Sequence, residues 1–374
     1  MLKINWKKVI GWGLAVLVVI GVVGTNMYNQ QKKSSNTEVF KIKALVPLTG
    51  QAASVADSIR EGIELAKDEL NSRYGKKFEI VLLDSGSEPS TAVSIYRQQI
   101  ESAGTNQALL YTLSPVGKAI TPILDGKILT FALAAVEGLA NPEKNIFQLS
   151  PKSVDVKPAL IDFIKKHNVK TVSVVYPGND YGIENLNIVR SAISENGGKV
   201  VQEVPYSNTD FDFRIQSLKL KKENADMIFV IGVGSTYLNV LRDINAQEYD
   251  GILMSDWSFA IPHFYTAYPE LTERVYMISP IPPKFFEEAY QKKYHKPAWM
   301  LEAGVFYDSI ILTAEACEKT DCSADSMGKY ISSIKNYNGA VGNYSFNSAG
   351  DITVKTAVSK MKDGRIVPVE SEGK

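Results

Sequence analysis

Polar residues that could bind a ligand stand at the ends of three predicted strands. Ser114 follows the apolar run Ala108 to Leu113, and Asp256 ends the run that begins at Gly251. Tyr181 follows a third run, 172–176, and is flanked by Asp180 and Gly182. A carboxylate that ends a buried strand needs a partner, because an unpaired charge is costly to bury. In open α/β sheets, ligands bind at the carboxyl ends of the strands, so these residues are candidates for ligand binding.

Each candidate also has a purely structural interpretation. Ser114 could be the N-cap of the helix that Pro115 opens, and Asp256 could cap a segment that starts near Phe259. Tyr181 could be an ordinary loop tyrosine, and Trp257 could pack in the core instead of lining a site. The sequence leaves these alternatives open.

Signatures of catalysis are missing. The stretch Gly232-Val-Gly234 begins like a dinucleotide loop but lacks the third glycine, and no phosphate loop or nucleophile elbow occurs. The three histidines, His167, His263 and His295, are widely separated. We therefore expect a binding protein without a cofactor, and not an enzyme.

The two cysteines, Cys317 and Cys322, have four residues between them at a predicted helix end. They could close a small disulfide loop, which an exported location permits, or remain two free thiols. A metal site is not expected, because no third or fourth ligand has suitable spacing.

The segment 170–199 shows the unit that positions the candidates. An apolar strand, 172–176, ends at Pro177-Gly178, and Ile183, Leu186, Val189 and Ile193 then share one face of a helix that Gly197 stops. Such strand–helix units occur in two series, before and after about residue 150. Alternating strands and helices predict parallel sheets covered on both faces. After residue 283 helices alone follow, and an antiparallel end lies near Asp363-Gly364.

The length of the chain and its net charge limit the number of domains and the kind of partner. A chain of 374 residues is long for one core, so two domains are expected. Lys+Arg and Asp+Glu are both 41, which gives no reason to expect a nucleic acid partner.

The N-terminus has the pattern of an export segment. Lys3, Lys7 and Lys8 precede the apolar run 9–24, and a polar stretch follows. This pattern fits an uncleaved membrane anchor, which we favour, and also a cleaved signal peptide. Both place the rest of the chain outside the cytoplasm.

Several motifs carry a resemblance to a known family. They are Val46-Pro-Leu-Thr-Gly50, Gly62-Ile-Glu-Leu-Ala66, Asp180-Tyr-Gly182, Tyr206-Ser-Asn-Thr-Asp-Phe211, Gly304-Val-Phe-Tyr-Asp308 and Asn338-Gly-Ala-Val-Gly342. With these motifs in this order, the chain resembles the family of leucine/isoleucine/valine-binding proteins, from about Phe40 to Val369.

The resemblance implies a type I periplasmic-binding fold, in which two doubly wound parallel-sheet lobes are joined by a three-stranded hinge. Lobe 1 would comprise residues 37–152 and 283–337, and lobe 2 residues 153–282 and 338–369, with an export segment and linker at 1–36 and a tail at 370–374. The hinge would cross near 150–155, 279–283 and 337–341.

The resemblance also implies site residues. Ser114 matches a hydroxyl that binds a carboxylate, and Tyr181 an aromatic residue that covers the ligand. Asp256 matches the carboxylate that takes an ammonium group, with Trp257 beside it. Three more candidates come from the segment whose backbone holds the ligand: Ala132, Ala134 and Ala135. Ala135 stands at or next to a threonine of the relatives. Val55 sits where they often carry an aromatic residue, and Glu302 falls where they often have an aromatic residue near the hinge.

Together these features predict a monomeric extracytoplasmic protein that closes on a small polar ligand, most simply an amino acid. It would deliver the ligand to the membrane permease of an ABC importer. The alternative is a membrane-anchored sensor with the same fold.

Overall fold

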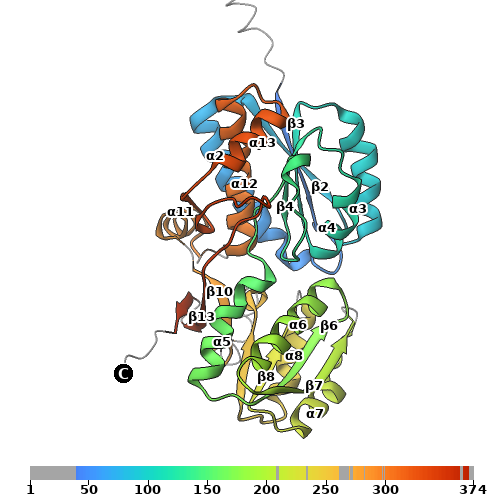
Figure 1. Ribbon diagram of the computed structural model, residues 1–374, viewed down its shortest axis with the longest axis vertical. Helices are drawn as coiled ribbons and strands as arrows, with labels where there is room; N and C mark the ends of the chain where they lie inside the picture. Colours follow the sequence, from blue (N-terminus) through green and yellow to red (C-terminus); the bar gives the residue numbers. More distant parts are fainter. Residues whose placement is uncertain are drawn as a thin grey trace, which may run out of the picture. The chain divides into compact units, whose positions relative to one another are not determined.

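A computed structural model describes residues 39–207, 210–232, 235–260, 269, 273–281, 283–296, 298, 300–362 and 365–369. In these ranges the chain is a mixed α/β protein with two larger sheets and one short two-stranded sheet (Figure 1).

The first sheet has five strands in the order β2-β1-β3-β4-β5. Neighbours from β1 to β5 pair in parallel, with Lys41 opposite Gln107 and Ala108 opposite Leu129. Helices α3 and α4 cover the face that carries Leu109 and Tyr111. The elements are β1 (Phe40–Val46), α2 (Ala56–Tyr74), β2 (Phe78–Asp84), α3 (Pro89–Ile95), β3 (Gln107–Thr112), α4 (Ser114–Ile120), β4 (Leu129–Leu133) and β5 (Ile146–Gln148).

The second sheet has seven strands in the order β14-β13-β10-β9-β8-β6-β7. Strands β6 to β10 pair in parallel, whereas β13 and β14 add an antiparallel end. Helices α5 and α6 bury their apolar side chains against one face, around Val172 and Phe229. The elements are α5 (Lys157–Lys166), β6 (Thr171–Pro177), α6 (Asp180–Ser194), β7 (Lys199–Tyr206), α7 (Arg214–Lys222), β8 (Met227–Val230), α8 (Ser235–Asn245), β9 (Ile252–Ser255), β10 (Tyr276–Pro280), β13 (Thr356–Lys362) and β14 (Arg365–Pro368).

Between β10 and β13 the chain returns to the first sheet. Helix α12 (Met300–Lys319) lies along α2, next to α13 (Ala324–Ser333), as Figure 1 shows. Gly62 of α2 must lack a side chain there, because a Cβ would lie 2.2 Å from the carbonyl oxygen of Ala303. The remaining elements of this segment are α11 (Lys284–Tyr294), β11 (Tyr337–Gly339) and β12 (Gly342–Tyr344).

Short 3-10 or π segments complete the described structure. They are Ala53–Val55, Gly75–Lys77, Tyr96–Ile100, Glu101–Ala103, Thr121–Ile123, Pro142–Lys144, Ser153–Val156 and Trp257–Ala260.

The predicted fold class, two parallel-sheet lobes of α/β type, is confirmed. The passage of the chain from β12 to β13 comes later than the predicted crossing at 337–341. Phe346 still packs against Phe131 and Phe147 of the first sheet, and Asp351 forms a bridge with Gln148. The chain therefore reaches the second sheet between Asp351 and Thr356. The domain boundaries as a whole remain a prediction.

The first and last passages between the sheets are bonded to each other. Lys152 forms an ion pair of 2.9 Å with Asp351, and the Thr356 hydroxyl donates to the Asp155 carbonyl at 2.8 Å. The bonded residues are about 200 positions apart in the chain. The two interactions therefore hold the first and the last passage side by side.

One prediction about a helix face is wrong. Ile183 is 49% exposed, so it lies outside the buried face of α6. In the segment that leads into α7, Phe211, Ile215 and Leu218 are 75%, 69% and 55% exposed. The buried face of this segment carries Phe213, Ser217 and Leu220 instead.

Candidate functional site

Two of the predicted site residues are hydrogen-bonded to each other. The Tyr181 hydroxyl, on the first turn of α6, donates to Oδ2 of Asp256, directly after β9, at 2.7 Å. Tyr181 is 7% and Asp256 0% exposed. A buried carboxylate with this tyrosine as a donor can pair with a positive group of a ligand, since burial strengthens charge pairing.

The loop before α6 explains how Tyr181 reaches that position. Asn179 caps the helix by accepting a hydrogen bond from the Gly182 N–H at 3.1 Å. A Cβ on Gly182 would lie 1.9 Å from the carbonyl oxygen of Pro177, so only glycine lets the helix begin so close to the end of β6. The motif Asp180-Tyr181-Gly182 therefore has a structural reason at Gly182.

Trp257 and Ala135 lie near the same tyrosine. Both are buried in the cluster of apolar side chains that contains Tyr181. Trp257 packs in this core, which is the structural alternative that the sequence left open, and its role as a ligand contact stays a prediction. Ala135 comes from the first series of strands and helices, so the cluster joins both series.

Ser114 is the first residue of α4 and is 4% exposed. It is not the N-cap, because Leu113 takes that position and no side chain caps the helix. Leu113 has φ of +73°, a conformation that costs a residue with a side chain about 1–3 kcal/mol and is concentrated at functional sites. The capping alternative for Ser114 is therefore wrong, and its role toward a carboxylate remains a prediction.

The carbonyl groups of the alanine segment already have partners in the protein. The Ala132 carbonyl accepts from Leu149 N–H at 3.1 Å and that of Ala135 from Ser153 N–H at 2.9 Å. The Ala134 carbonyl accepts from the Gln148 amide at 2.7 Å. A ligand at this segment would thus rely on the second lone pairs of these oxygens or on other groups.

Elements of both series meet beside these residues. Helices α4 and α6 are in contact, and the Glu137 N–H donates to the Glu184 carboxylate at 3.2 Å. Burial raises the pKa of Glu184 to about 7, and the nearby charges of Glu137 and Asp180 act in the same direction. No sequence pattern marks Glu184, because its contact with Glu137 depends on how α6 meets the loop after β4.

The described residues include no cluster of three metal-ligating side chains. They also include no helix long and apolar enough to cross a membrane. The predicted export segment at 9–24 and His263 lie outside the residues that the structure describes.

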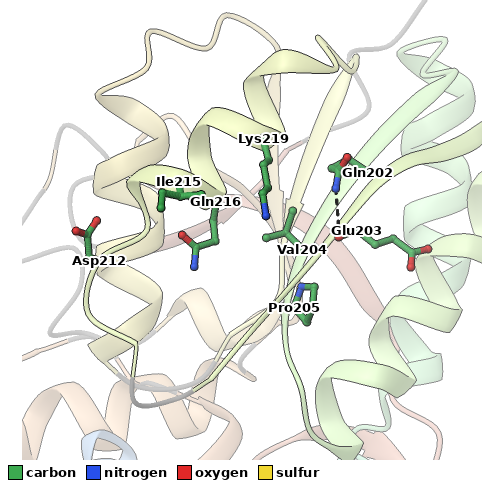
Figure 2. Close-up of a pocket in the computed structure, with 8 residues that line it drawn as sticks. All are labelled: Gln202, Glu203, Val204, Pro205, Asp212, Ile215, Gln216 and Lys219. Carbon is green, nitrogen blue, oxygen red and sulfur yellow. Dashed lines mark hydrogen bonds between the residues drawn. The ribbon is translucent and has the colours of Figure 1, made fainter.

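A hollow on the second sheet, beside its edge strand, contains none of the predicted site residues. Figure 2 shows it between β7 and α7, lined by Gln202, Glu203, Val204, Pro205, Asp212, Ile215, Gln216 and Lys219. Because none of the predicted site residues lines this hollow, it is not part of the candidate site.

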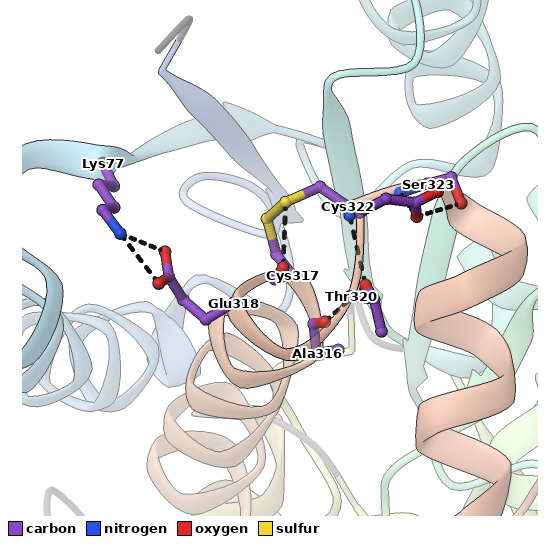
Figure 3. The surroundings of a disulfide bond; sticks show 8 residues. Lys77, Ala316, Cys317, Glu318, Thr320, Cys322 and Ser323 are labelled. Atoms are coloured by element: carbon purple, nitrogen blue, oxygen red, sulfur yellow. Dashed lines mark hydrogen bonds and ion pairs between the residues drawn. A yellow bond between two sulfur atoms is a disulfide. The ribbon is translucent and has the colours of Figure 1, made fainter. Parts of the chain in front are cut away.

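Cys317 and Cys322 are joined at the end of α12, with their Cα atoms 4.1 Å apart (Figure 3). Thr320, between them, donates to the Ala316 carbonyl at 2.7 Å, and Glu318 pairs with Lys77 at 2.9 Å. The bond thus closes a short loop at a helix end that is held by other contacts.

For this disulfide we expect no reactive thiol when the unfolded, unreduced protein is titrated. After reduction, the free energy of unfolding should fall only slightly, because closing so short a loop removes little entropy from the unfolded chain. Two reactive thiols in the unreduced protein would contradict the disulfide.

Two parallel-sheet lobes joined by several passages are the architecture of two-lobed periplasmic binding proteins. A family model described as periplasmic binding protein matches residues 40–365, and the chain belongs to this family. The predicted resemblance to its leucine/isoleucine/valine-binding members is confirmed.

Individual relatives are distant. The Leu/Ile/Val-binding protein homolog 3 of Brucella melitensis is 24% identical, over 88% of this chain and 93% of its own. The substrate-binding protein of a branched-chain amino acid transporter from Streptococcus pneumoniae, solved with isoleucine, superimposes with a TM-score of 0.77 at 21% identity, covering 88% and 98% of the two chains. An ABC transporter solute-binding protein of R. palustris, solved with benzoate, gives 0.77 at 18% identity, covering 88% and 95%.

Proposed function

We propose that this protein is an extracytoplasmic solute-binding protein that closes on a small polar ligand, most simply an amino acid, and delivers it to an ABC importer. The observation that carries the proposal is the buried Tyr181–Asp256 pair at the strand ends of the second sheet. Closure of two lobes around a ligand would bury most of its surface and give a permease a distinct shape to recognise.

Two features support a ligand with both a carboxylate and a positive group. Isoleucine and benzoate, which are bound by the two structural neighbours, share a carboxylate. Ser114, at the end of β3, offers a hydroxyl to such a group, and Asp256 offers a carboxylate to an ammonium group. The ligand would lie between them and touch strand ends of both series.

A thermal-shift screen tests the proposal. The purified protein is heated with each of the common amino acids and their amides, with sugars, and with benzoate and short-chain acids. A compound that binds only the folded state should raise the melting temperature, and the rise should grow with concentration. Absence of any shift across the amino acids and carboxylic acids would refute the proposal in this form.

Uptake measurements address the importer. Cells that lack the protein should lose uptake of the radiolabelled ligand found in the screen, and the full chain should restore it. Unchanged uptake would favour the sensor alternative.

A further inference from the structure

Glu302 has a carboxyl oxygen that is buried without a hydrogen-bond partner. Among the described residues, eight buried side-chain polar atoms lack a partner, and Glu302 Oε2 is the only one that belongs to an ionisable group. Buried polar atoms are nearly always bonded in folded proteins, so one that is not bonded calls for an explanation. Burial raises the pKa of this carboxyl group to about 7, as expected where no positive group compensates for lost water.

The position of Glu302 follows from how α12 lies against α2. Successive contacts join Gly62 to Ala303, Glu69 to Tyr307, and Lys77 to Glu318. Because the numbers rise together, the two helices run in the same direction, and their first turns lie at the same end.

That end is the carboxyl edge of the first sheet. Helix α2 follows the loop that leaves β1, and Asp84 at the end of β2 accepts hydrogen bonds from Leu48 N–H and Thr49 N–H in this loop, at 2.9 Å and 3.1 Å. Ser114 begins α4 at the end of β3, at the same edge. Glu302 therefore lies at the edge that carries the candidate site of the first sheet.

A second unpartnered atom lies at this edge. Ser54 precedes α2 but does not cap it, because the helix begins at Ala56 after a 3-10 turn and its cap position is Val55. The Ser54 hydroxyl oxygen is buried and also has no partner. Ser54 and Glu302 thus each have a buried oxygen without a hydrogen bond at this edge of the first sheet.

Basic groups of the preceding segment do not supply the missing partner. Lys293 pairs with Asp68, and Lys296 with Glu61, each at 2.7 Å. Neither lysine is therefore recorded as a partner of Glu302, whose Oε2 has no hydrogen bond among the described residues.

We propose that Glu302 is a specificity-determining residue, which accepts a hydrogen bond from a donor group on the ligand at the first-sheet side of the site. The Ser54 hydroxyl lies in the turn before α2, at the same edge of the sheet. The ligand class is then a small carboxylate that carries a second donor, such as a side-chain hydroxyl, amide or ammonium group, instead of a purely aliphatic amino acid. This inference rests on the proposed function.

Matched pairs of compounds test it. Each pair shares a skeleton and differs in one donor: L-valine and L-threonine, L-norleucine and L-lysine, benzoate and 4-hydroxybenzoate. Affinities are measured by thermal shift and titration calorimetry. In each pair that binds, the wild type should bind the donor-bearing member at least about tenfold more tightly. The apolar member would leave the Glu302 carboxyl group without a hydrogen-bond donor.

Three variants complete the design. Glu302→Leu should remove the preference and leave binding of the apolar member intact. Glu302→Gln keeps the volume and an acceptor, so it should weaken L-lysine more than L-threonine. Glu318→Gln, on the same helix but paired with Lys77, is the matched control and should leave the preference unchanged.

The outcomes separate the two proposals. Equal or tighter binding of the apolar member in every pair that binds, or an unchanged preference in Glu302→Leu and Glu302→Gln, overturns the inference while the binding function stands. If none of these compounds and none in the wider screen stabilises the wild type, the proposed function fails and the inference falls with it.

Discussion

Replacing Asp256 with alanine should weaken binding of an ammonium-bearing ligand by about a hundredfold or more. In the closed protein the ligand ammonium would pair with this carboxylate in a site from which water is largely excluded. Removal of one partner leaves the other charge buried alone, at a cost of several kcal/mol, and each 1.4 kcal/mol is about tenfold in affinity. Titration calorimetry with the compound that gives the largest thermal shift measures the loss.

Two variants separate charge from shape. Asp256→Asn keeps the volume and should lose most of the same affinity. Tyr181→Phe removes only the hydroxyl that donates to Asp256 at 2.7 Å, and should cost less than the loss of the charge. Unchanged affinity in both Asp256 variants would make Asp256 a structural residue and remove the main argument for an ammonium group.

The same substitution should also affect the empty protein. In the structure Asp256 is fully buried and bonded to Tyr181. Asp256→Ala should therefore lower the free energy of unfolding by about 1–3 kcal/mol, the cost of depriving a buried donor of its acceptor.

Asp308→Ala should have the largest effect on stability, a loss of about 3–5 kcal/mol. Asp308 is 1% exposed and lies on α12. Its carboxylate accepts from Ala340 N–H at 2.6 Å, Val341 N–H at 3.1 Å and the Tyr344 hydroxyl at 3.1 Å. Without it, three buried donors, on β12 and on the turn before it, lose their acceptor. Urea unfolding measures the change.

The exposed Asp162→Ala on α5 is a matched control, and we expect it to change the free energy of unfolding by less than about 0.5 kcal/mol. A loss below about 1 kcal/mol for Asp308→Ala would show that water replaces the carboxylate.

Stability should also depend on pH through Asp308. Burial raises the pKa of Asp308 from its ordinary value of 3.8 to about 7 in the folded state, which outweighs the lowering by its three hydrogen bonds. Between about pH 4 and 7 the folded state therefore holds a proton that the unfolded state has lost. The stabilisation by this retained proton is complete below about pH 4 and disappears as the pH rises to about 7. The free energy of unfolding of the wild type, compared with that of Asp308→Asn at each pH, should show this decline.

Local pattern was enough for the fold class. Apolar runs of strand length, separated by helical stripes and by breaks such as Pro177-Gly178, specify alternating strands and helices wherever they occur. The close spacing of Cys317 and Cys322 likewise brought them within reach of each other without tertiary information. The placement of Ser114 and Asp256 at strand ends also follows from where the apolar runs stop.

Helix faces needed the tertiary structure. In the segment 211–220, Phe211, Ile215 and Leu218 share one stripe, and Phe213, Ser217 and Leu220 share another with the same spacing. Periodicity shows which residues lie together but not which stripe meets the sheet. The packing of α7 between β7 and α8 decided that the second stripe is buried.

Contacts between residues that are far apart in the sequence could not be predicted from local pattern either. Tyr181 and Asp256 are 75 positions apart, and they meet because the sheet places β9 two strands from β6, with β8 between them. Glu302 and Ser54 lie at one edge because α12 returns to pack along α2 in the same direction. By itself the sequence determined the units and the residues at their ends. The strand order and the return of the last helices decided which of those ends form one site, since hydrogen bonds and buried charges depend on distances in space and not on spacing along the chain.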